Sequence, residues 1–158
     1  LRILQVLTRA GLGEVGLTDL AAALRHAGRL LRRRRLIFLI SDFLAPVGWD
    51  APLRDLAQRH DVIAVWIRDP AEEELPDVGV IPISDPETGQ QAWVDSSDRR
   101  VRAAYREMVQ ARQGEVREIL RRARVDPLEL STAASMVEPL VKFITLRRQR
   151  ARWHSPGR

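Results

Sequence analysis

The sequence predicts an α/β fold in which helices cover both faces of a parallel sheet. Two short runs of bulky apolar residues, 36–40 and 62–67, are typical of strands that are buried on both faces. Residues 51–60, which lie between them, repeat apolar side chains at helical spacing. Strands that alternate with helices pair in parallel, so residues 1–150 are predicted to form one domain, followed by a basic, flexible tail over 151–158.

The amino-terminal segment is predicted to contain two helices separated by a loop. Residues 1–10 form the first helix, and three glycines within 11–16 end it. Thr18 and Asp19 then offer a hydroxyl and a carboxylate to the free amides at the start of a second helix. The apolar side chains of this helix recur on one face, at Leu20, Leu24, Ala27 and Leu31.

Residues 78–95 depart from the α/β pattern and predict a β-hairpin insertion. Two short apolar runs, 79–83 and 91–94, flank a turn that contains proline and glycine. Pro82 cannot donate a backbone hydrogen bond, which places the hairpin at an edge of the main sheet or outside it. We expect the hairpin to cover one sheet edge as a lid, and a role as a docking surface is the alternative.

A long helix, a third strand and a last helix complete the predicted elements. The long helix begins at residue 96 or 97 and continues to about residue 124, with apolar residues at spacings of three and four. Residues 128–130 are predicted as the third strand. Ser135 and Glu138 form a capping-box pattern at the start of the last helix.

Composition excludes several classes of protein. The chain has 158 residues, of which 45% are hydrophobic and 30% charged, values that exclude a disordered or fibrous protein. No apolar run approaches the ~20 residues that span a bilayer. Cysteine is absent, which excludes disulfide scaffolds, thiolate zinc sites and cysteine nucleophiles. Without a secretory segment at its start, the chain is expected to be a cytoplasmic piece of a longer protein.

The net charge is positive but unevenly placed. The formal net charge is +5, and the 26 basic residues are 25 arginines and Lys142. Five arginines lie between residues 147 and 158, and the rest of the chain is close to neutral. One interpretation is attraction to nucleic acid. The other is a general bias towards arginine, which the scarcity of aromatic residues for base stacking favours.

Polar residues follow the predicted strands, where the sites of parallel α/β sheets gather. Asp42 is the strongest candidate because it comes one residue after a five-residue apolar run. Two interpretations are open: the carboxylate caps the following loop, or it is a ligand of a hard cation such as Mg²⁺. Thr18 is either a helix cap or a ligand of the same cation. The other polar residues at these strand ends are Ser41, Asp69, Ser131 and Thr132.

Common catalytic and cofactor motifs are absent from the sequence. It has no phosphate-binding loop, no Gly-x-Ser-x-Gly nucleophile motif and no His-Glu-x-x-His zinc motif. No pair of carboxylates is placed for general acid and base catalysis. These absences favour a protein that is not an enzyme.

Several stretches of the chain resemble a known family. Residues 16–20 and 36–44 resemble the later half of a von Willebrand factor A-type domain. The chain is more closely similar to the carboxyl-terminal part of the bacterial family called domain of unknown function 58, whose members are typically encoded beside MoxR-type AAA+ ATPases. Further stretches that match are 59–65, 74–79, 85–89, 94–98 and 128–132.

The resemblance implies a metal-ion-dependent adhesion site. Such a site takes an Asp-x-Ser-x-Ser loop, a threonine from a second loop and an aspartate from a third. Thr18 matches the threonine and Asp42 the aspartate, while the first loop would lie upstream of Leu1. An Mg²⁺ site would therefore be incomplete in this chain. The strand at 36–40 would also lack its inner neighbour and present an apolar open edge.

The function that the resemblance implies is assembly rather than catalysis. A bound cation would keep one position for a carboxylate of a partner protein, and the expected partners are a MoxR-type AAA+ ATPase and a client that it remodels. Two alternatives remain: a magnesium-dependent phosphoester hydrolase that uses Asp42, and a basic nucleic-acid-binding module.

Overall fold

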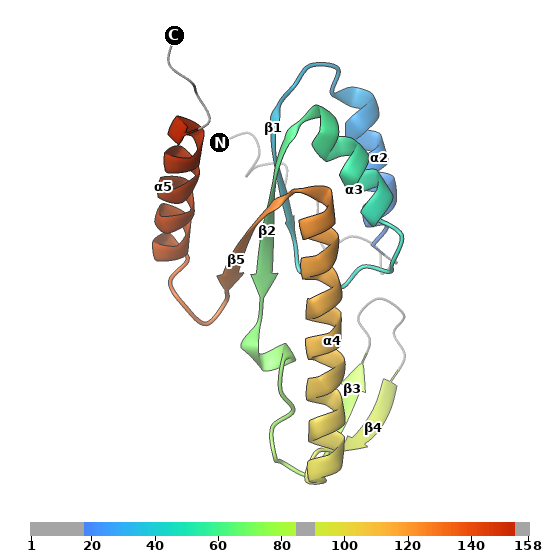
Figure 1. The fold of residues 1–158 in the computed structure, drawn as a ribbon. Coiled ribbons are helices and arrows are strands. Elements are labelled where there is room, and N and C mark those ends of the chain that lie inside the picture. Colours follow the sequence, from blue (N-terminus) through green and yellow to red (C-terminus); the bar gives the residue numbers. More distant parts are fainter. Residues whose placement is uncertain (1–17, 85–90, 154–158) are drawn as a thin grey trace, which may run out of the picture.

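Three parallel strands form the main sheet, in the order β1-β2-β5 (Figure 1). The computed structural model describes residues 18–84 and 91–153, and the helix and loop predicted before residue 18 lie outside these ranges. Strand β1 is Leu36–Ser41, β2 is Asp61–Arg68 and β5 is Asp126–Ser131. All three strands end at the same edge of the sheet, because both pairings are parallel.

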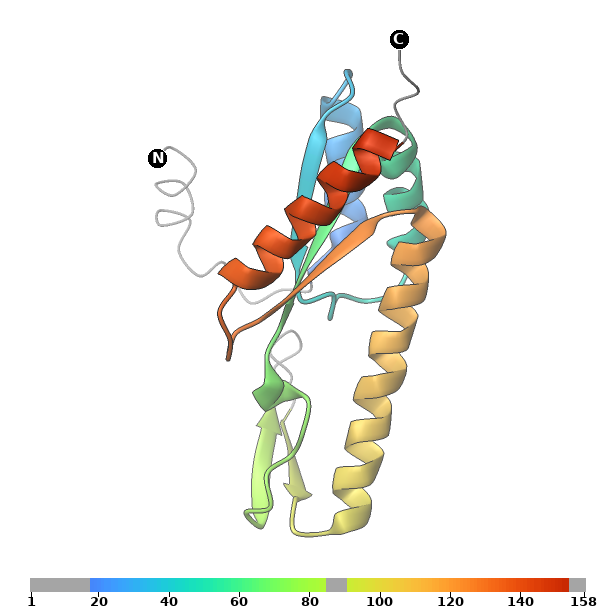
Figure 2. The ribbon, with the colours of Figure 1, turned by 60° about the vertical axis from the view of Figure 1, so that its left-hand side comes forward.

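Helices cover both faces of the sheet, as the alternation of elements predicted (Figures 1 and 2). On one face lie α2 (Leu20–Leu30), α3 (Asp50–Arg59) and the carboxyl-terminal half of α4 (Arg99–Ala123). On the other face lies α5 (Val137–Trp153). Within the two described ranges, no helix combines the length and the apolar character needed to cross a membrane.

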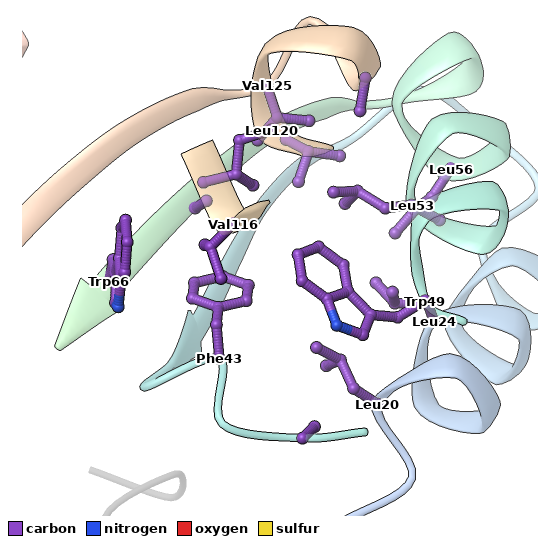
Figure 3. Close-up of a cluster of buried hydrophobic side chains, with 14 residues drawn as sticks. Leu20, Leu24, Phe43, Trp49, Leu53, Leu56, Trp66, Val116, Leu120 and Val125 are labelled. Atoms are coloured by element: carbon purple, nitrogen blue, oxygen red, sulfur yellow. The ribbon is translucent and has the colours of Figure 1, made fainter. Parts of the chain in front are cut away.

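Strand β2 is the centre of both apolar cores, which confirms its predicted burial on both faces. Its side chains alternate between faces, so Ala64 and Trp66 pack under α2, α3 and α4, while Ile63 and Val65 face α5. The larger core also contains side chains from three helices and from the loop after β1. Figure 3 shows this cluster and labels Leu20, Leu24, Phe43, Trp49, Leu53, Leu56, Trp66, Val116, Leu120 and Val125.

The prediction that β1 is buried on both faces is wrong, because within residues 18–84 and 91–153 only one of its faces is covered. Leu36, Phe38 and Ile40 are 54%, 53% and 66% exposed. They lie on the α5 face, but the apolar cluster that packs against Phe143 of α5 is built from residues of β2 and β5. Among the described residues β1 pairs only with β2, so the open apolar edge expected for this strand is present.

The hairpin is confirmed, but its described strands pair with each other and do not cover an edge of the main sheet as a lid would. Strands β3 (Val80–Ser84) and β4 (Gln91–Asp95) form a separate antiparallel sheet. Figures 1 and 2 show this hairpin beside the amino-terminal half of α4, beyond the carboxyl ends of the main strands. We call the hairpin and residues 99–110 of α4 the arm. Helix α4 is longer than the strands of the sheet. Its first half therefore extends beyond the sheet and lies beside the hairpin.

Two helices start at different residues from those predicted. Asp19, rather than Thr18, caps α2, because its Oδ1 accepts a hydrogen bond from the Ala22 amide at 2.7 Å. Asp98 caps α4 in the same way, through the Arg100 amide. In both cases the carboxylate stands directly before the first helical residue and reaches the free amide. The predicted third strand is also longer than expected, since β5 begins at Asp126.

Candidate functional site

Asp42 lies where the sequence placed it, directly after β1 at the carboxyl edge of the sheet. Its side chain is exposed, and its Oδ1 accepts a hydrogen bond from the Leu44 amide at 3.0 Å. One oxygen of the Asp42 carboxylate therefore caps the loop after β1, as one of the two interpretations predicted. The backbone carbonyl of Asp42 accepts a hydrogen bond from Nε1 of Trp66 at 3.0 Å, which ties the residue to β2.

The loop after Asp42 is fixed by the burial of Phe43. The ring is 0% exposed and lies 5.3 Å from the ring of Trp49 and 6.1 Å from that of Trp66, between centroids (Figure 3). The backbone of Phe43 has φ 59°, a left-handed conformation that is unfavourable for residues with a Cβ atom. Ser41 Oγ accepts a hydrogen bond from the Phe43 amide at 3.0 Å. The packing of one ring thus maintains an unfavourable backbone next to the candidate ligand.

Arg112 of α4 holds the same loop from the other side. Its guanidinium donates hydrogen bonds to the backbone carbonyls of Phe43, at 3.3 Å, and Ala45. These carbonyls flank Leu44, whose amide binds the Asp42 carboxylate. A helix 67 residues or more away in sequence therefore contributes directly to the loop conformation.

Thr18 is exposed and stands two residues before the first buried side chain of α2. That side chain, Leu20, belongs to the same core cluster as Phe43, and Figure 3 shows both beside the Trp49 ring. The fold thus brings the start of α2 and the loop after β1 to one side of the core. Since Asp19 supplies the cap of α2, the capping interpretation of Thr18 is wrong.

The other polar residues at the strand ends have local roles. Oδ1 of Asp69 accepts a hydrogen bond from the Ala71 amide at 2.9 Å and caps the short 3-10 helix η1 (Pro70–Glu72). Ser131 Oγ accepts one from the Ala133 amide at 3.3 Å, and the Thr132 amide donates to the Arg68 carbonyl. Asp69 and Ser131 thus stabilise the turns after their own strands, while Thr132 continues the pairing of β5 with β2.

An ion-pair network occupies the ends of β2 and β5. Arg68 binds Glu73 at 2.7 Å and Glu129 at 2.9 Å, and Arg117 binds Glu129 at 3.2 Å. Burial opposes ionisation of Glu129, but the hydrogen bonds from Arg117 and Arg68 outweigh it, so the pKa of Glu129 lies below its ordinary value. A cavity of about 280 Å³ adjoins this network, lined by Arg68, Pro70, Glu73, Glu129, Leu130 and Ser131. Asp42 and Thr18 do not line it.

The chemistry of Asp42 and Thr18 fits a hard cation, although two side chains cannot complete its shell. A carboxylate and a hydroxyl are oxygen donors, which Mg²⁺ prefers, and Mg²⁺ commonly keeps several water ligands. No group of three or more His, Cys, Asp or Glu side chains suited to a metal occurs in residues 18–84 and 91–153. The remaining ligands would be water or groups outside these ranges.

The roles of Arg112 and Trp66 in the loop after β1 were not predicted from the sequence. A signal for Arg112 was present, since it interrupts an apolar series at spacing four that includes Met108, Val116 and Leu120. A charged residue at such a position faces the core and must find partners there. Trp66 lies in a run that predicts a buried strand, but no pattern in the sequence indicates which carbonyl its indole nitrogen reaches.

Comparison with known proteins identifies relatives along most of the chain. Residues 2–115 match the family described as Protein of unknown function DUF58. An uncharacterised protein of Mycobacterium avium is 34% identical over 151 residues, which are 96% of this chain and 88% of that protein. An uncharacterised protein of Mycobacterium tuberculosis is 35% identical over 151 residues, but this chain spans only 47% of its length.

A third relative is described by its genomic position. An uncharacterised protein in the moxR 3′ region of Paracoccus denitrificans is 35% identical over 103 residues, which are 64% of this chain and 96% of that protein. No solved structure matches the chain.

Proposed function

The chain belongs to the DUF58 family of proteins of unknown function, and on that premise we propose that it is part of a von Willebrand factor A-like, metal-dependent protein-interaction module. The module works with a MoxR-type AAA+ ATPase on a client protein and catalyses no reaction itself. The observation that carries this proposal is the exposed carboxylate of Asp42, presented at the end of β1 by a loop that both β2 and α4 hold.

Asp42 and Thr18 would hold the cation. One oxygen of Asp42 accepts the Leu44 amide, so its other oxygen is the one suited to a ligand. The cation would supply a positive charge with an exchangeable position for a carboxylate of the partner, so that charge complementarity selects the partner. Thr18 and Asp42 belong to segments that enter one core cluster, which supports a shared role.

The arm supports a protein as the partner. Trp93 and Val80 on the hairpin are 75% and 61% exposed, and Met108 on the adjoining part of α4 is 60% exposed. Exposed tryptophan is enriched among the residues that contribute most to protein–protein affinity. The arm extends beyond the carboxyl edge at which Asp42 lies (Figure 2). A partner that reaches the cation could contact the arm as well.

The identity of the ATPase partner rests on genomic position. The relative from Paracoccus denitrificans is described as lying in the moxR 3′ region. Genes that lie together often encode proteins that act together, and this supports a MoxR-type ATPase as the partner of the present chain.

Titration of the full-length protein with Mg²⁺, followed by backbone amide chemical shifts, tests the proposal. We expect saturable shifts around Thr18 and Asp42. Asp42→Asn keeps an oxygen for the Leu44 amide but loses the charge, and it should abolish the shifts. Thr18→Val should weaken binding. Asp69→Asn is the matched control, because Asp69 also follows a strand and accepts a hydrogen bond from an amide two residues on.

Two results would contradict the proposal. Shifts that persist unchanged in Asp42→Asn would remove Asp42 from the site. Phosphatase activity of the full-length protein that disappears in Asp42→Asn would favour a hydrolase.

Co-precipitation with the MoxR-type ATPase, in the presence of Mg²⁺ and in the presence of a chelator, tests the partner. We expect binding that requires both Mg²⁺ and Asp42.

A further inference from the structure

We infer that Arg112 and Trp66 are positioning residues, which hold the loop after β1 so that the Asp42 carboxylate faces a cation. This inference rests on the proposed function for the cation, but the loop geometry stands independently of it. The two residues come from different elements, α4 and β2, and both contact the backbone of the loop rather than the carboxylate.

Trp66 fixes the first residue of the loop. Its indole nitrogen donates to the Asp42 carbonyl at 3.0 Å, and its side chain is only 3% exposed. The guanidinium groups of Arg68 and Arg117 lie over the ring, 5.7 and 5.3 Å from its centroid. Both arginines are bound to Glu129. The ion-pair network at the ends of β2 and β5 thus restrains the orientation of the indole, and the indole restrains Asp42.

Arg112 fixes the next part of the loop. It binds the carbonyls of Phe43 and Ala45, the residues on either side of Leu44. The Leu44 amide in turn holds Oδ1 of Asp42. Loss of the guanidinium would therefore release the amide that orients the carboxylate, without removing any ligand of the cation.

The left-handed backbone of Phe43 explains why such contacts are needed. A residue with a side chain adopts φ 59° at a cost, and such conformations persist where the surroundings over-determine them. Without the two donors, relaxation of this backbone would turn Asp42 away from the direction that the fold imposes. Restraint of a ligand by neighbouring hydrogen bonds typically affects metal affinity by about 10- to 100-fold.

The test uses Arg112→Met and Trp66→Phe in the full-length protein. Trp66→Phe retains an aromatic ring but removes the donor. Arg106→Met is the matched control, since Arg106 lies on the same helix and pairs with exposed Glu74 at 3.2 Å. Mg²⁺ affinity is measured by calorimetry, and hydrogen exchange of the Leu44 amide is compared with that of Leu53 in the buried face of α3.

We expect Arg112→Met and Trp66→Phe each to weaken Mg²⁺ binding by about tenfold or more and to accelerate exchange at Leu44 but not at Leu53. Arg106→Met should change neither quantity. Arg112→Lys keeps a cationic donor, so it should restore part of the affinity.

Other outcomes separate this inference from the proposed function. If both variants lower the melting temperature but leave Leu44 exchange and Mg²⁺ affinity unchanged, the residues are merely structural and the inference is overturned. If the wild type binds no Mg²⁺, the proposed function fails, and exchange at Leu44 alone decides whether Arg112 and Trp66 hold the loop. Unchanged exchange then overturns the inference, and faster exchange supports it.

Discussion

Replacing Phe43 first with alanine and then with glycine separates the packing of its ring from the strain of its backbone. The ring is 0% exposed between two tryptophans, so Phe43→Ala should lower the free energy of unfolding by about 3 to 5 kcal/mol. The further change from alanine to glycine removes no more of the ring. The step from alanine to glycine removes the Cβ methyl group and frees the backbone at position 43, where φ is 59°.

Three contributions decide the effect of this second step. Loss of the buried methyl group costs about 0.8 kcal/mol. The greater freedom of glycine in the unfolded chain costs about 0.5 to 1 kcal/mol. Relief of the left-handed conformation returns about 1 to 2 kcal/mol. The three nearly cancel, so the Phe43→Gly and Phe43→Ala variants should have unfolding free energies within about 1 kcal/mol of each other.

Ala57→Gly is the control for this comparison. Ala57 lies inside α3 and packs against the larger core, so its replacement brings no relief of strain and should cost about 1 kcal/mol or more. Urea unfolding of the three variants, followed by circular dichroism, provides the free energies. If glycine at position 43 costs as much relative to alanine as it does at position 57, the backbone of Phe43 is not left-handed in solution, and the argument for a restrained loop fails.

Three further predictions concern the network, α5 and the open edge. The lowered pKa of Glu129 means that its ionised form stabilises the fold above its ordinary pKa of 4.5, so the stability difference between wild type and Glu129→Gln should be full at pH 7 and shrink as the pH falls below about 4.5. A difference that stays constant down to pH 3 would contradict the assigned ion pairs. Arg147 binds Asp61 at 2.6 Å and Asp126 at 3.6 Å, so Arg147→Leu should cost about 1 to 3 kcal/mol in urea unfolding and accelerate amide exchange in α5; unchanged exchange would show that other contacts hold α5. Ile40→Lys places a charge on the exposed face of edge strand β1 and should reduce self-association of the chain in light scattering with little loss of stability, whereas a large loss would show that this face is covered.

The main architecture was predictable because its signals are local. The runs at 36–40 and 62–67 are apolar without interruption. Between them lie residues 51–60, whose apolar side chains recur at helical spacing. Hydrophobic periodicity and the order of elements suffice to indicate parallel strands. The position of Asp42 followed from the same reasoning, because a residue directly after a parallel strand lies at the carboxyl edge of the sheet.

The exposure of β1 could not be read from its composition. Leu36, Phe38 and Ile40 are as apolar as the buried residues of β2, yet no described element covers them. Burial on a second face depends on where α5 packs, and α5 is anchored over β2 and β5 by Phe143 and by the ion pairs of Arg147. Such coverage is a property of the packed molecule.

The class of fold, the strand that Asp42 follows and the apolar character of the core depend on neighbouring residues, so they could be predicted from the sequence. The contacts by which Trp66 and Arg112 hold the loop that carries Asp42 are visible only in the folded chain. These donors lie 24 residues or more from the atoms they bind, and no local pattern specifies a hydrogen bond across such a separation. Only in the folded chain do the indole of Trp66 and the guanidinium of Arg112 lie beside the carbonyls of the loop after β1. Burial of the Phe43 ring favours the left-handed backbone in which these carbonyls accept both hydrogen bonds.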